Sequence, residues 1–430
     1  MSNNDTLDLR AVAAQALQQM LAQGFDQAQV SASHTAQDEL NVNHDEASLL
    51  RSTENLKLSL LGIAGGRMAS TEIADFSPEA VREGIARLHA DAQSAPEDPA
   101  NAVSSGQQAN IVQGPQQPDL DLLADKVREL LAFREAETPK MQIEEAAARH
   151  MLQRWHTLTS GGSRIDCSLG WYSMELMGTA REGKQASSFN YTGGSADELA
   201  GRHAAEHFGI GEMMRDTEQQ IHTQPLGAKF VGDVILTPPA LESLLGWLLG
   251  QLSDMQLIAG SSLYRQRVGQ AIASPLFTLS SRFQAPGVAP LSADAFVTPP
   301  VQVVGAGVLK TLTPSLYGSR KTGLPHVPVA GGWEVAAGDT PRAQLVSGVA
   351  RGAIVGRLSM GNPAPNGDFS GVIKNSFLIE NGAVGPALSE TMIAGNMAQM
   401  LRELQAVSRE RLDTGRLLLP WTRIGGLHFS

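Results

Sequence analysis

The sequence of 430 residues contains a single cysteine, Cys167. One thiol excludes an internal disulfide framework and leaves too few thiolates for a cysteine-rich zinc site, so a metal would need histidine and carboxylate ligands. Long apolar runs are missing as well, because the richest stretch, residues 244–252, is far shorter than the roughly 20 residues of a membrane span. The first residues also lack the basic start and apolar segment of a signal peptide. We therefore expect a cytoplasmic protein with no membrane-bound part.

Positive charge is scarce, with 33 Lys and Arg against 44 Asp and Glu and a formal net charge of -11. A protein that neutralises nucleic-acid phosphates has the opposite balance, so we expect no direct nucleic-acid binding. The sequence has no P-loop and no G-x-S-x-G elbow. Residues 304–308 hold two glycines of a dinucleotide fingerprint but neither the third glycine nor a later acidic residue, so they predict a hairpin turn.

The N-terminal part alternates between helical and strand-like patterns. Apolar residues at near-helical spacing over 5–23, followed by Gly24, predict an opening helix. Short alternating runs over 28–71 predict antiparallel strands, and Ser77-Pro78-Glu79 predicts the start of a second helix. We take residues 1–93 as an N-terminal α+β module. Residues 94–118 have few large apolar side chains and are interpreted as an exposed linker.

Two further modules follow from the same patterns. Residues 119–226 form a middle α+β module, with a helix near 120–131, strands within 158–191 and a helix over 196–208. Residues 227–430 form a C-terminal β-rich domain. Its predicted elements are a strand over 228–236, a leucine-rich helix that begins at Thr237-Pro238, short strands bounded by glycine and proline, and a helix over 388–411. The predicted class is α+β: helix and antiparallel-sheet modules, then a mostly antiparallel β domain with a few helices.

One short motif could carry chemistry of its own. His203-Ala-Ala-Glu206-His207 matches H-x-x-E-H, in which two histidines one helical turn apart bind zinc and the glutamate acts as a base. On the helix predicted for 196–208, both imidazoles would lie on one face. That face also carries Leu199, and no third ligand can be assigned. The favoured interpretation is therefore a pair of part-buried histidines, with a zinc site as the alternative.

Three blocks near the C-terminus are rich in turn signals: residues 366–371 (NGDFSG), 377–382 (FLIENG) and 390–396 (ETMIAGN). In physical terms, the first two predict turns on either side of a strand, and the third leads into a helix. In this order and spacing, the blocks resemble the C-terminal signature of the TldD/PmbA family, also labelled modulators of DNA gyrase. The resemblance extends to the N-terminal helix and strands, to the helix start at Ser77, and to residues 228–252, so it covers most of the chain.

The resemblance implies that the C-terminal blocks belong to the domain that forms the assembly. Their side chains would then lie near a groove or a subunit contact. The candidates in these blocks are Asp368, Phe369, Ser370, Glu380, Asn381 and Asn396.

Catalytic members of the family, the TldD type, resemble zinc peptidases with an HExxxH helix and a later cysteine ligand. Their Leu-Leu-His-Glu-x-x-Gly-His falls on residues 244–251, so the ligand positions hold Gly246 and Gln251 and the general-base position holds Trp247. Glycine has no side chain, an amide is a poor zinc ligand, and indole cannot accept a proton. No cysteine follows Cys167. The resemblance therefore points to the metal-free PmbA (TldE) branch.

The resemblance implies a non-catalytic subunit without a cofactor of its own. It would pair with a TldD-like zinc peptidase, or with itself as a dimer, in the processing or degradation of small unfolded peptides. Strands bounded by glycine could accept such a peptide by β-augmentation. Two alternatives stay open: an independent metallopeptidase that uses His203, Glu206 and His207, and a homodimeric peptide-binding scaffold.

Overall fold

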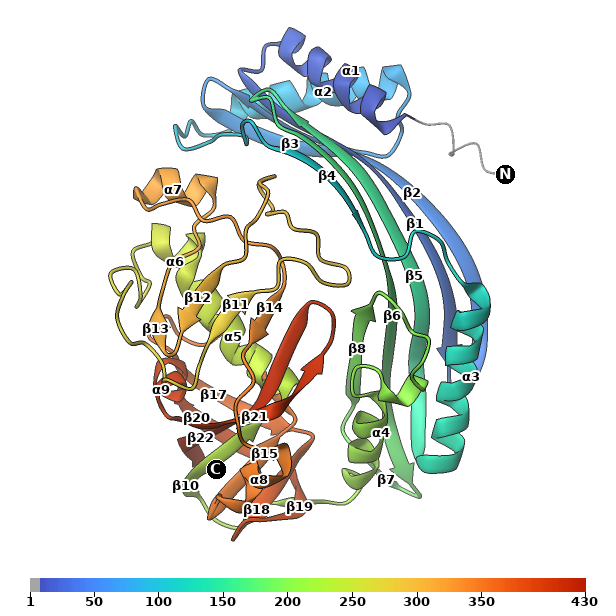
Figure 1. The fold of residues 1–430 in the computed structure, drawn as a ribbon, viewed down its shortest axis with the longest axis vertical. Helices are drawn as coiled ribbons and strands as arrows, with labels where there is room; N and C mark the ends of the chain where they lie inside the picture. The colour runs from blue at the N-terminus through green and yellow to red at the C-terminus, as the bar shows by residue number, and fades with distance from the viewer. Residues whose placement is uncertain (1–7) are drawn as a thin grey trace.

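The computed structural model describes residues 8–430, which form two sheets flanked by helices. The N-terminal half builds a long curved sheet, and the C-terminal domain lies on the concave side of that sheet (Figure 1). The C-terminal domain has its own sheet, with helices between the strands. This arrangement confirms the predicted α+β class. Among residues 8–430, no helix has the length and apolar character to cross a membrane.

Three helices cover the convex side of the curved sheet (Figure 1). α1 (Leu9–Gln23) begins after Asp8, whose carboxylate accepts hydrogen bonds from two N–H groups of the first turn. It ends at Gly24, which has a φ of 105° and closes the helix as a left-handed C-cap. The predicted start of this helix, Asp5, lies outside the described residues. The other two helices are α2 (Pro78–Ser94), capped by Ser77, and α3 (Leu120–Glu137), capped by Asp119.

The curved sheet has the strand order β3-β2-β1-β5-β6-β4, with β7 and β8 also paired to β6. Its long central strands are antiparallel, so side chains opposite one another share a face: Ser31, Thr157 and Ile165 form one such row. Apolar residues of the convex face pack under α1 and α2 at one end and α3 at the other. The strands are β1 (Gln27–Asn43), β2 (Glu46–Ala64), β3 (Arg67–Ile73), β4 (Gln108–Gln113), β5 (Met141–Thr159), β6 (Arg164–Glu182), β7 (Gln185–Ala186) and β8 (Asn190–Ala196).

Residues 94–118 differ from the exposed connector that the composition predicts. They contain β4, which pairs in parallel with residues 164–169 of β6. Ser104 is buried and donates a hydrogen bond to Ser163. Backbone hydrogen bonds, rather than large apolar side chains, attach this segment to the sheet, and composition alone does not reveal them.

The predicted helix over residues 196–208 is wrong. The structure has only a short 3-10 turn there, η2 (Ala204–Glu206), and the helix α4 (Ile210–Gln219) follows it. Gly201 and Gly209, with φ of 74° and 71°, interrupt any helix through this segment. Phe208 also has a positive φ, so the apolar spacing around Leu199 belongs to an irregular segment packed on the sheet.

The C-terminal domain is organised around α5 (Pro238–Leu252), whose leucine stripe lies in the domain core as predicted. The surrounding sheet is mixed: most pairs are antiparallel, but β10 pairs in parallel with β15 and β14 with β22. The strands are β9 (Thr223–Pro225), β10 (Phe230–Leu236), β11 (Leu279–Ser281), β12 (Gln302–Gly305), β13 (Val308–Leu309), β14 (Trp333–Val335), β15 (Arg351–Val355), β16 (Arg357–Met360), β17 (Asp368–Lys374), β18 (Ser376–Glu380), β19 (Ala383–Ser389), β20 (Met392–Asn396), β21 (Leu404–Asp413) and β22 (Leu417–Phe429). The remaining helices are α6 (Asp254–Ile258), α7 (Leu316–Thr322), α8 (Arg342–Ser347) and α9 (Met397–Arg402).

The helix predicted over residues 388–411 is much shorter than expected. Only α9 is helical, with Asn396 as its N-cap. The flanking residues form β20, which pairs with β17, and β21, which pairs with β22. Pairing with existing strands buries the same apolar side chains that suggested a helix, so tertiary contacts decide the structure here.

Candidate functional site

The H-x-x-E-H motif does not lie on an α-helix. His203 caps the 3-10 turn through Nδ1, which accepts a hydrogen bond from Ala205 N–H at 3.2 Å. His207 is buried, its Nε2 lies 3.1 Å from the Leu199 carbonyl oxygen, and burial lowers the pKa of its ring. Glu206 is exposed. Without an α-helix the two imidazoles do not share a face, which corrects the sequence-based geometry. Over the described range 8–430, no three His, Cys, Asp or Glu side chains converge as metal ligands.

The family's metal-site positions on α5 are occupied by side chains with structural roles. Gln251 is only 2% exposed, and both ends of its amide are used. Its Nε2 donates to the Pro365 carbonyl at 3.0 Å, and its Oε1 accepts from Leu263 N–H at 2.9 Å. Gln251 therefore joins two loops to the helix.

Trp247 fills the space next to Gln251. Its ring packs edge-on against Tyr264 with centroids 6.1 Å apart. Burial raises the pKa of the Tyr264 hydroxyl to about 12, so this group remains a neutral phenol at physiological pH. The Trp247 Nε1 and Tyr264 hydroxyl are buried without a hydrogen-bond partner within residues 8–430. A zinc ion does not fit this position, because glycine, indole and an engaged amide supply no ligand set.

The first C-terminal block forms a tight, internally bonded turn. Asn366 and Asn396 both donate to the carboxylate of Asp368, at 2.7 and 2.8 Å. These two hydrogen bonds lower the pKa of Asp368. Gly367 has a φ of 94°, and a Cβ there would lie 3.1 Å from the Trp247 ring. The turn thus closes over the α5 region, with Phe369 buried beneath it and Ser370 exposed.

The second block lies elsewhere on the same sheet. Asn381 and Gly382 have φ of 50° and 75°, which makes a primed turn between β18 and β19. Their N–H groups donate to the carbonyls of Ala350 and Val349. Glu380 forms an exposed ion pair with Arg351 at 3.6 Å. The structure therefore brings Asp368 and Asn396 together, whereas Glu380 and Asn381 lie apart from this pair. Both blocks form the turns that the sequence predicts.

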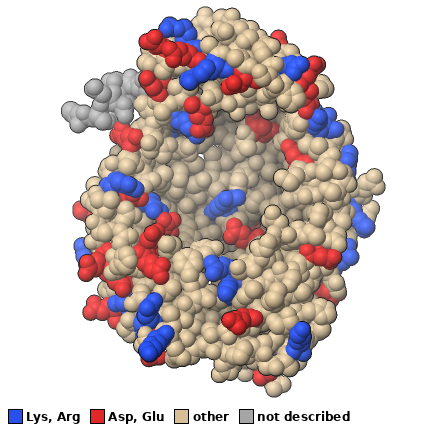
Figure 2. Space-filling model, turned by 180° about the vertical axis from the view of Figure 1, so that it is seen from behind, with Lys and Arg blue, Asp and Glu red and all other residues tan. Residues whose placement is uncertain are grey.

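A cavity lies between the concave face of the curved sheet and the C-terminal domain. Its volume is about 610 Å³. Seen from behind, the molecule is hollowed at its centre (Figure 2). One wall is the polar face of β1, β5 and β6, and the other is loop 287–295 together with two residues near β14 and β22. The lining side chains used below are Gln29, Ser31, Gln153, Trp155, Thr157, Leu291, Ser292 and Arg416.

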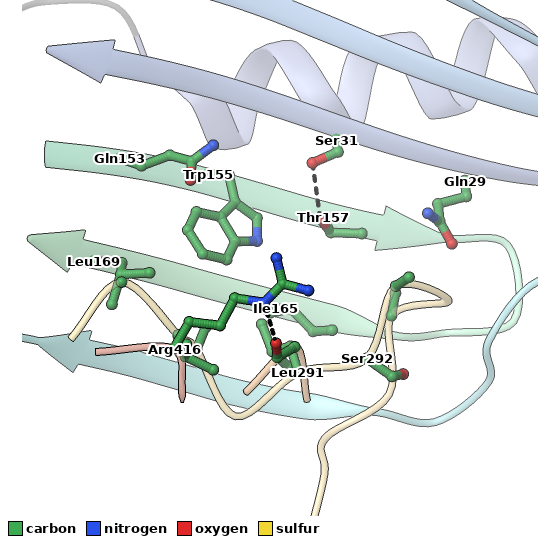
Figure 3. Close-up of a pocket in the computed structure, with 16 residues that line it drawn as sticks. Gln29, Ser31, Gln153, Trp155, Thr157, Ile165, Leu169, Leu291, Ser292 and Arg416 are labelled. Carbon is green, nitrogen blue, oxygen red and sulfur yellow. Dashed lines mark hydrogen bonds between the residues drawn. The ribbon is translucent and has the colours of Figure 1, made fainter. Parts of the chain in front are cut away.

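Within residues 8–430, Arg416 is the one charged side chain that lines this cavity. Its Nε donates to the Gly331 carbonyl at 2.8 Å, and its own carbonyl accepts from Trp333 N–H at 2.9 Å. Figure 3 shows the guanidinium extending into the cavity beside the indole of Trp155. With respect to residues 8–430, Arg416 forms no ion pair. A positive group thus stands in a hollow whose other lining side chains are uncharged, some polar and some apolar.

The same concave face continues into a second hollow of about 340 Å³, whose lining includes Glu145, Arg149 and Glu175. Glu39 is 2% exposed and accepts hydrogen bonds from Arg51 and Arg149, and Arg149 also pairs with Glu175 at 2.6 Å. Burial alone would raise the pKa of Glu39, but the hydrogen bonds from the two arginines hold it below its usual value. In this hollow, unlike the first, the arginine is neutralised by carboxylates.

Ionic contacts join the two lobes on either side of the cavity. Asp98 accepts a hydrogen bond from the Tyr317 hydroxyl and an ion pair from Lys321, both at 2.8 Å. Hydrogen bonds from Lys321, the Ala100 N–H and Tyr317 lower the pKa of Asp98 to about 2. Toward the other end, α4 and α8 are joined by a bidentate pair between Glu212 and Arg342.

One titratable group at that second junction is strongly perturbed. Burial, together with the nearby Glu212 carboxylate, raises the pKa of Asp216 to about 7. Asp216 lies one helical turn after Glu212 on α4 and faces a small hollow that also borders Trp421. Its carboxyl group therefore keeps its proton to a higher pH than an exposed aspartate does.

Sequence reasoning missed the cavity and Arg416. Part of the signal was present, since Gln153, Trp155 and Thr157 occupy alternate positions of β5 and therefore lie on one face of the sheet. Arg416 gave no signal, because an arginine next to a glycine turn is common on protein surfaces. Its significance depends on loop 287–295, which is distant in sequence.

Comparison with known proteins gives a consistent picture. Residues 230–430 match the family described as the PmbA/TldA metallopeptidase C-terminal domain. The chain is 24% identical over 435 residues to the metalloprotease PmbA of Escherichia coli O157:H7, covering 93% of this chain and 92% of that protein. A PmbA homologue of Haemophilus influenzae is 27% identical over 188 residues, covering 39% of this chain and 42% of that protein.

Two solved structures share the fold. TldE from Thermococcus kodakarensis has a TM-score of 0.81 and 18% identity, covering 97% of this chain and 100% of the other. A Bacteroides thetaiotaomicron protein described as a modulator of DNA gyrase has a TM-score of 0.84 and 20% identity, covering all of both chains. At these identities the likeness establishes the fold, which therefore includes the curved sheet and the C-terminal domain together.

Proposed function

Because the chain belongs to the PmbA/TldD family and is metallopeptidase-related, we propose that it is the non-catalytic subunit of a peptidase assembly. In this proposal a TldD-like partner supplies the zinc ion and the hydrolytic chemistry. The present chain has no cofactor of its own and guides small unfolded peptides toward the partner. It acts in the cytoplasm.

The observation that carries the proposal is the structural use of Gln251. A degenerate metal position could still bind zinc weakly if nearby side chains were free to rearrange. Here the amide is buried and its nitrogen and oxygen each hold a different loop. Turning it toward a cation would break both hydrogen bonds and leave two backbone groups unsatisfied. Conversion to a metal site therefore requires a reorganised loop structure as well as histidines.

The alternative of an independent metallopeptidase has little support from geometry. His203 is exposed and capped to its own turn, whereas His207 is buried against a backbone carbonyl. Glu206 lies on the surface, and within residues 8–430 no three His, Cys, Asp or Glu side chains converge around it as metal ligands.

Peptide handling is supported by the shape and polarity of the cavity. Its glutamine, serine and threonine side chains can exchange hydrogen bonds with a peptide backbone without selecting a particular sequence. At one edge of the curved sheet, β4 pairs only with β6 in the described part of the chain, so its other edge is available for β-augmentation. The exposed Val112 on β4 is consistent with an edge open to a partner or a peptide.

The assembly contact is proposed to involve the C-terminal blocks. The turn that contains Asp368, Phe369, Ser370 and Asn396 and the hairpin that contains Glu380 and Asn381 are rigid and partly exposed. Rigid turns present the same surface to a partner without a large entropic cost. Both a TldD-like chain and a second copy of this chain could use such a surface.

Purification of the tagged chain from its native cells tests the proposal. The expected result is a stoichiometric second chain with an intact HExxxH motif and about one zinc ion per pair. Recovery of a metal-free homodimer would favour the scaffold alternative instead. About one tightly held zinc ion on the isolated chain, lost in His207→Ala, would establish the independent metallopeptidase and overturn the proposal.

A further inference from the structure

We infer that Arg416 makes the interlobe cavity a binding site for a carboxylate group on a peptide. This inference rests on the proposed peptide-handling function and specifies the chemical class of peptide that the cavity takes. Its basis is a single cation, held in place by the fold, in a hollow whose other lining residues are uncharged.

The guanidinium is positioned before any ligand arrives. Its Nε is bound to the Gly331 carbonyl, while the backbone on both sides is fixed by bonds from Trp333 N–H and to Thr414 O. Nη1 and Nη2 have no hydrogen-bond or ion-pair partner in the 8–430 range, and the group extends beside Trp155 (Figure 3). The paired terminal N–H groups match the two oxygens of a carboxylate.

The carboxylates near the cavity are engaged elsewhere. Asp294, in the loop that forms one wall, accepts hydrogen bonds from the Ser292 hydroxyl at 2.5 Å and from Leu316 N–H at 2.8 Å. Arg282, which borders the adjacent hollow, is neutralised by a bidentate pair with Asp413. Carboxylates outnumber cations in this chain, whose net charge is -11, yet only Arg282 of these two arginines is paired with one. The guanidinium of Arg416 is therefore able to bind an anion from outside the chain.

The cavity around Arg416 suits a peptide rather than a small inorganic anion. A volume of about 610 Å³ exceeds what a single anion fills. The indole of Trp155 offers a flat apolar surface for a peptide side chain. The Gln153 amide and the hydrogen-bonded hydroxyls of Ser31 and Thr157 offer hydrogen-bond donors and acceptors for a peptide backbone. The carboxylate can be the C-terminus of the peptide or an acidic side chain, since both present the same two oxygens.

Fluorescence anisotropy on the full chain separates these possibilities. Three labelled, unstructured peptides of equal length are used: a free acid without Asp or Glu, its C-terminal amide, and that amide with one internal Glu. We expect the free acid, the Glu peptide or both to bind at least ten times more tightly than the uncharged amide. Arg416→Gln should remove this preference, whereas Arg416→Lys should keep part of it.

The matched control is Arg409→Gln on the neighbouring strand, which also loses an arginine bonded to one backbone carbonyl. It should bind all three peptides as the wild type does. Equal binding of the three peptides by the wild type, or an unchanged preference in a folded Arg416→Gln variant, would overturn the inference and leave the proposed function standing. If the wild type binds none of the peptides, the peptide-handling role fails as well. Tight binding of the free acid indicates recognition of the peptide C-terminus, and tight binding of the Glu peptide indicates recognition of an acidic side chain.

Discussion

The α5 region and the interlobe cavity differ in how their polar groups are used. Around α5, the position equivalent to a metal ligand holds an amide whose two ends are bound to the protein itself. In the cavity, Arg416 has one end bound to the protein and the other directed into open space. The first region therefore contains a buried amide that holds two loops, and the second contains a guanidinium whose terminal N–H groups have no partner within residues 8–430.

We expect the largest effect on stability from a substitution in the core around α5. Leu248 is fully buried, so Leu248→Ala removes apolar contacts and leaves a cavity, and we expect unfolding to become easier by about 3 kcal/mol. Leu49→Ala, at a half-exposed position, should change stability by less than about 0.5 kcal/mol. Urea unfolding followed by tryptophan fluorescence measures both. Equal effects at the two positions would mean that α5 is not the core of its domain.

Gln251→Ala tests whether the former ligand position is now structural. The substitution leaves the Pro365 carbonyl and the Leu263 N–H without partners, and we expect a loss of about 2 kcal/mol. Gln344→Ala, an exposed glutamine on α8, serves as the control. A Gln251→Ala protein as stable as the wild type would show that the amide is free to turn, and the argument against a metal position would lose its main support.

The junction between α4 and the C-terminal domain should show an unusual pH dependence. The pKa of Asp216 is about 7 in the folded chain, above its usual value near 4. Between these values the unfolded chain ionises first, so stability should fall as pH rises from about 4 to 7 and then level off. Asp216→Asn should remove this slope and stabilise the protein at pH 8 by about 1 to 2 kcal/mol. An unchanged slope in thermal unfolding curves of the variant would contradict this assignment.

A smaller effect is expected from Asp368→Ala. Two asparagine side chains lose their acceptor at an exposed turn, so stability should fall by about 1 kcal/mol. If the turn is part of the assembly contact, the variant should also fail to assemble while remaining folded, which size-exclusion chromatography with light scattering measures. Loss of stability with unchanged assembly would leave the block with a turn role only. Ser370→Ala, on the exposed side of the same block, should preserve the turn.

Local patterns in the sequence were sufficient for elements whose chemistry is local. Ser77 and Gly24 define helix ends, and Asn381-Gly382 defines a hairpin, because their side chains or backbone freedom act on the nearest residues. Segments 196–208 and 388–411 were assigned to the wrong structure because sheet pairing and positive-φ glycines overrode a helical spacing.

In the candidate site, too, some features can be predicted from local sequence and others depend on long-range contacts. The loss of ligands at Gly246 and Gln251 is visible in the sequence, but the bonds that make Gln251 structural connect it to loops 12 and 114 positions away. The role of Arg416 is even harder to predict from the sequence, because its surroundings come from β5, loop 287–295 and the β21–β22 turn. Closure of these long-range contacts cannot be inferred from periodicity or local composition.

The central claim is that this chain assists hydrolysis without performing it. Its most direct test is the cleavage of an unstructured peptide by the purified chain alone, by a TldD-like partner alone, and by the two mixed in equal amounts. The account predicts no chelator-sensitive cleavage by this chain and at least a tenfold higher rate for the mixture than for the partner alone. Robust chelator-sensitive cleavage by this chain alone, in a preparation free of other peptidases, would contradict it.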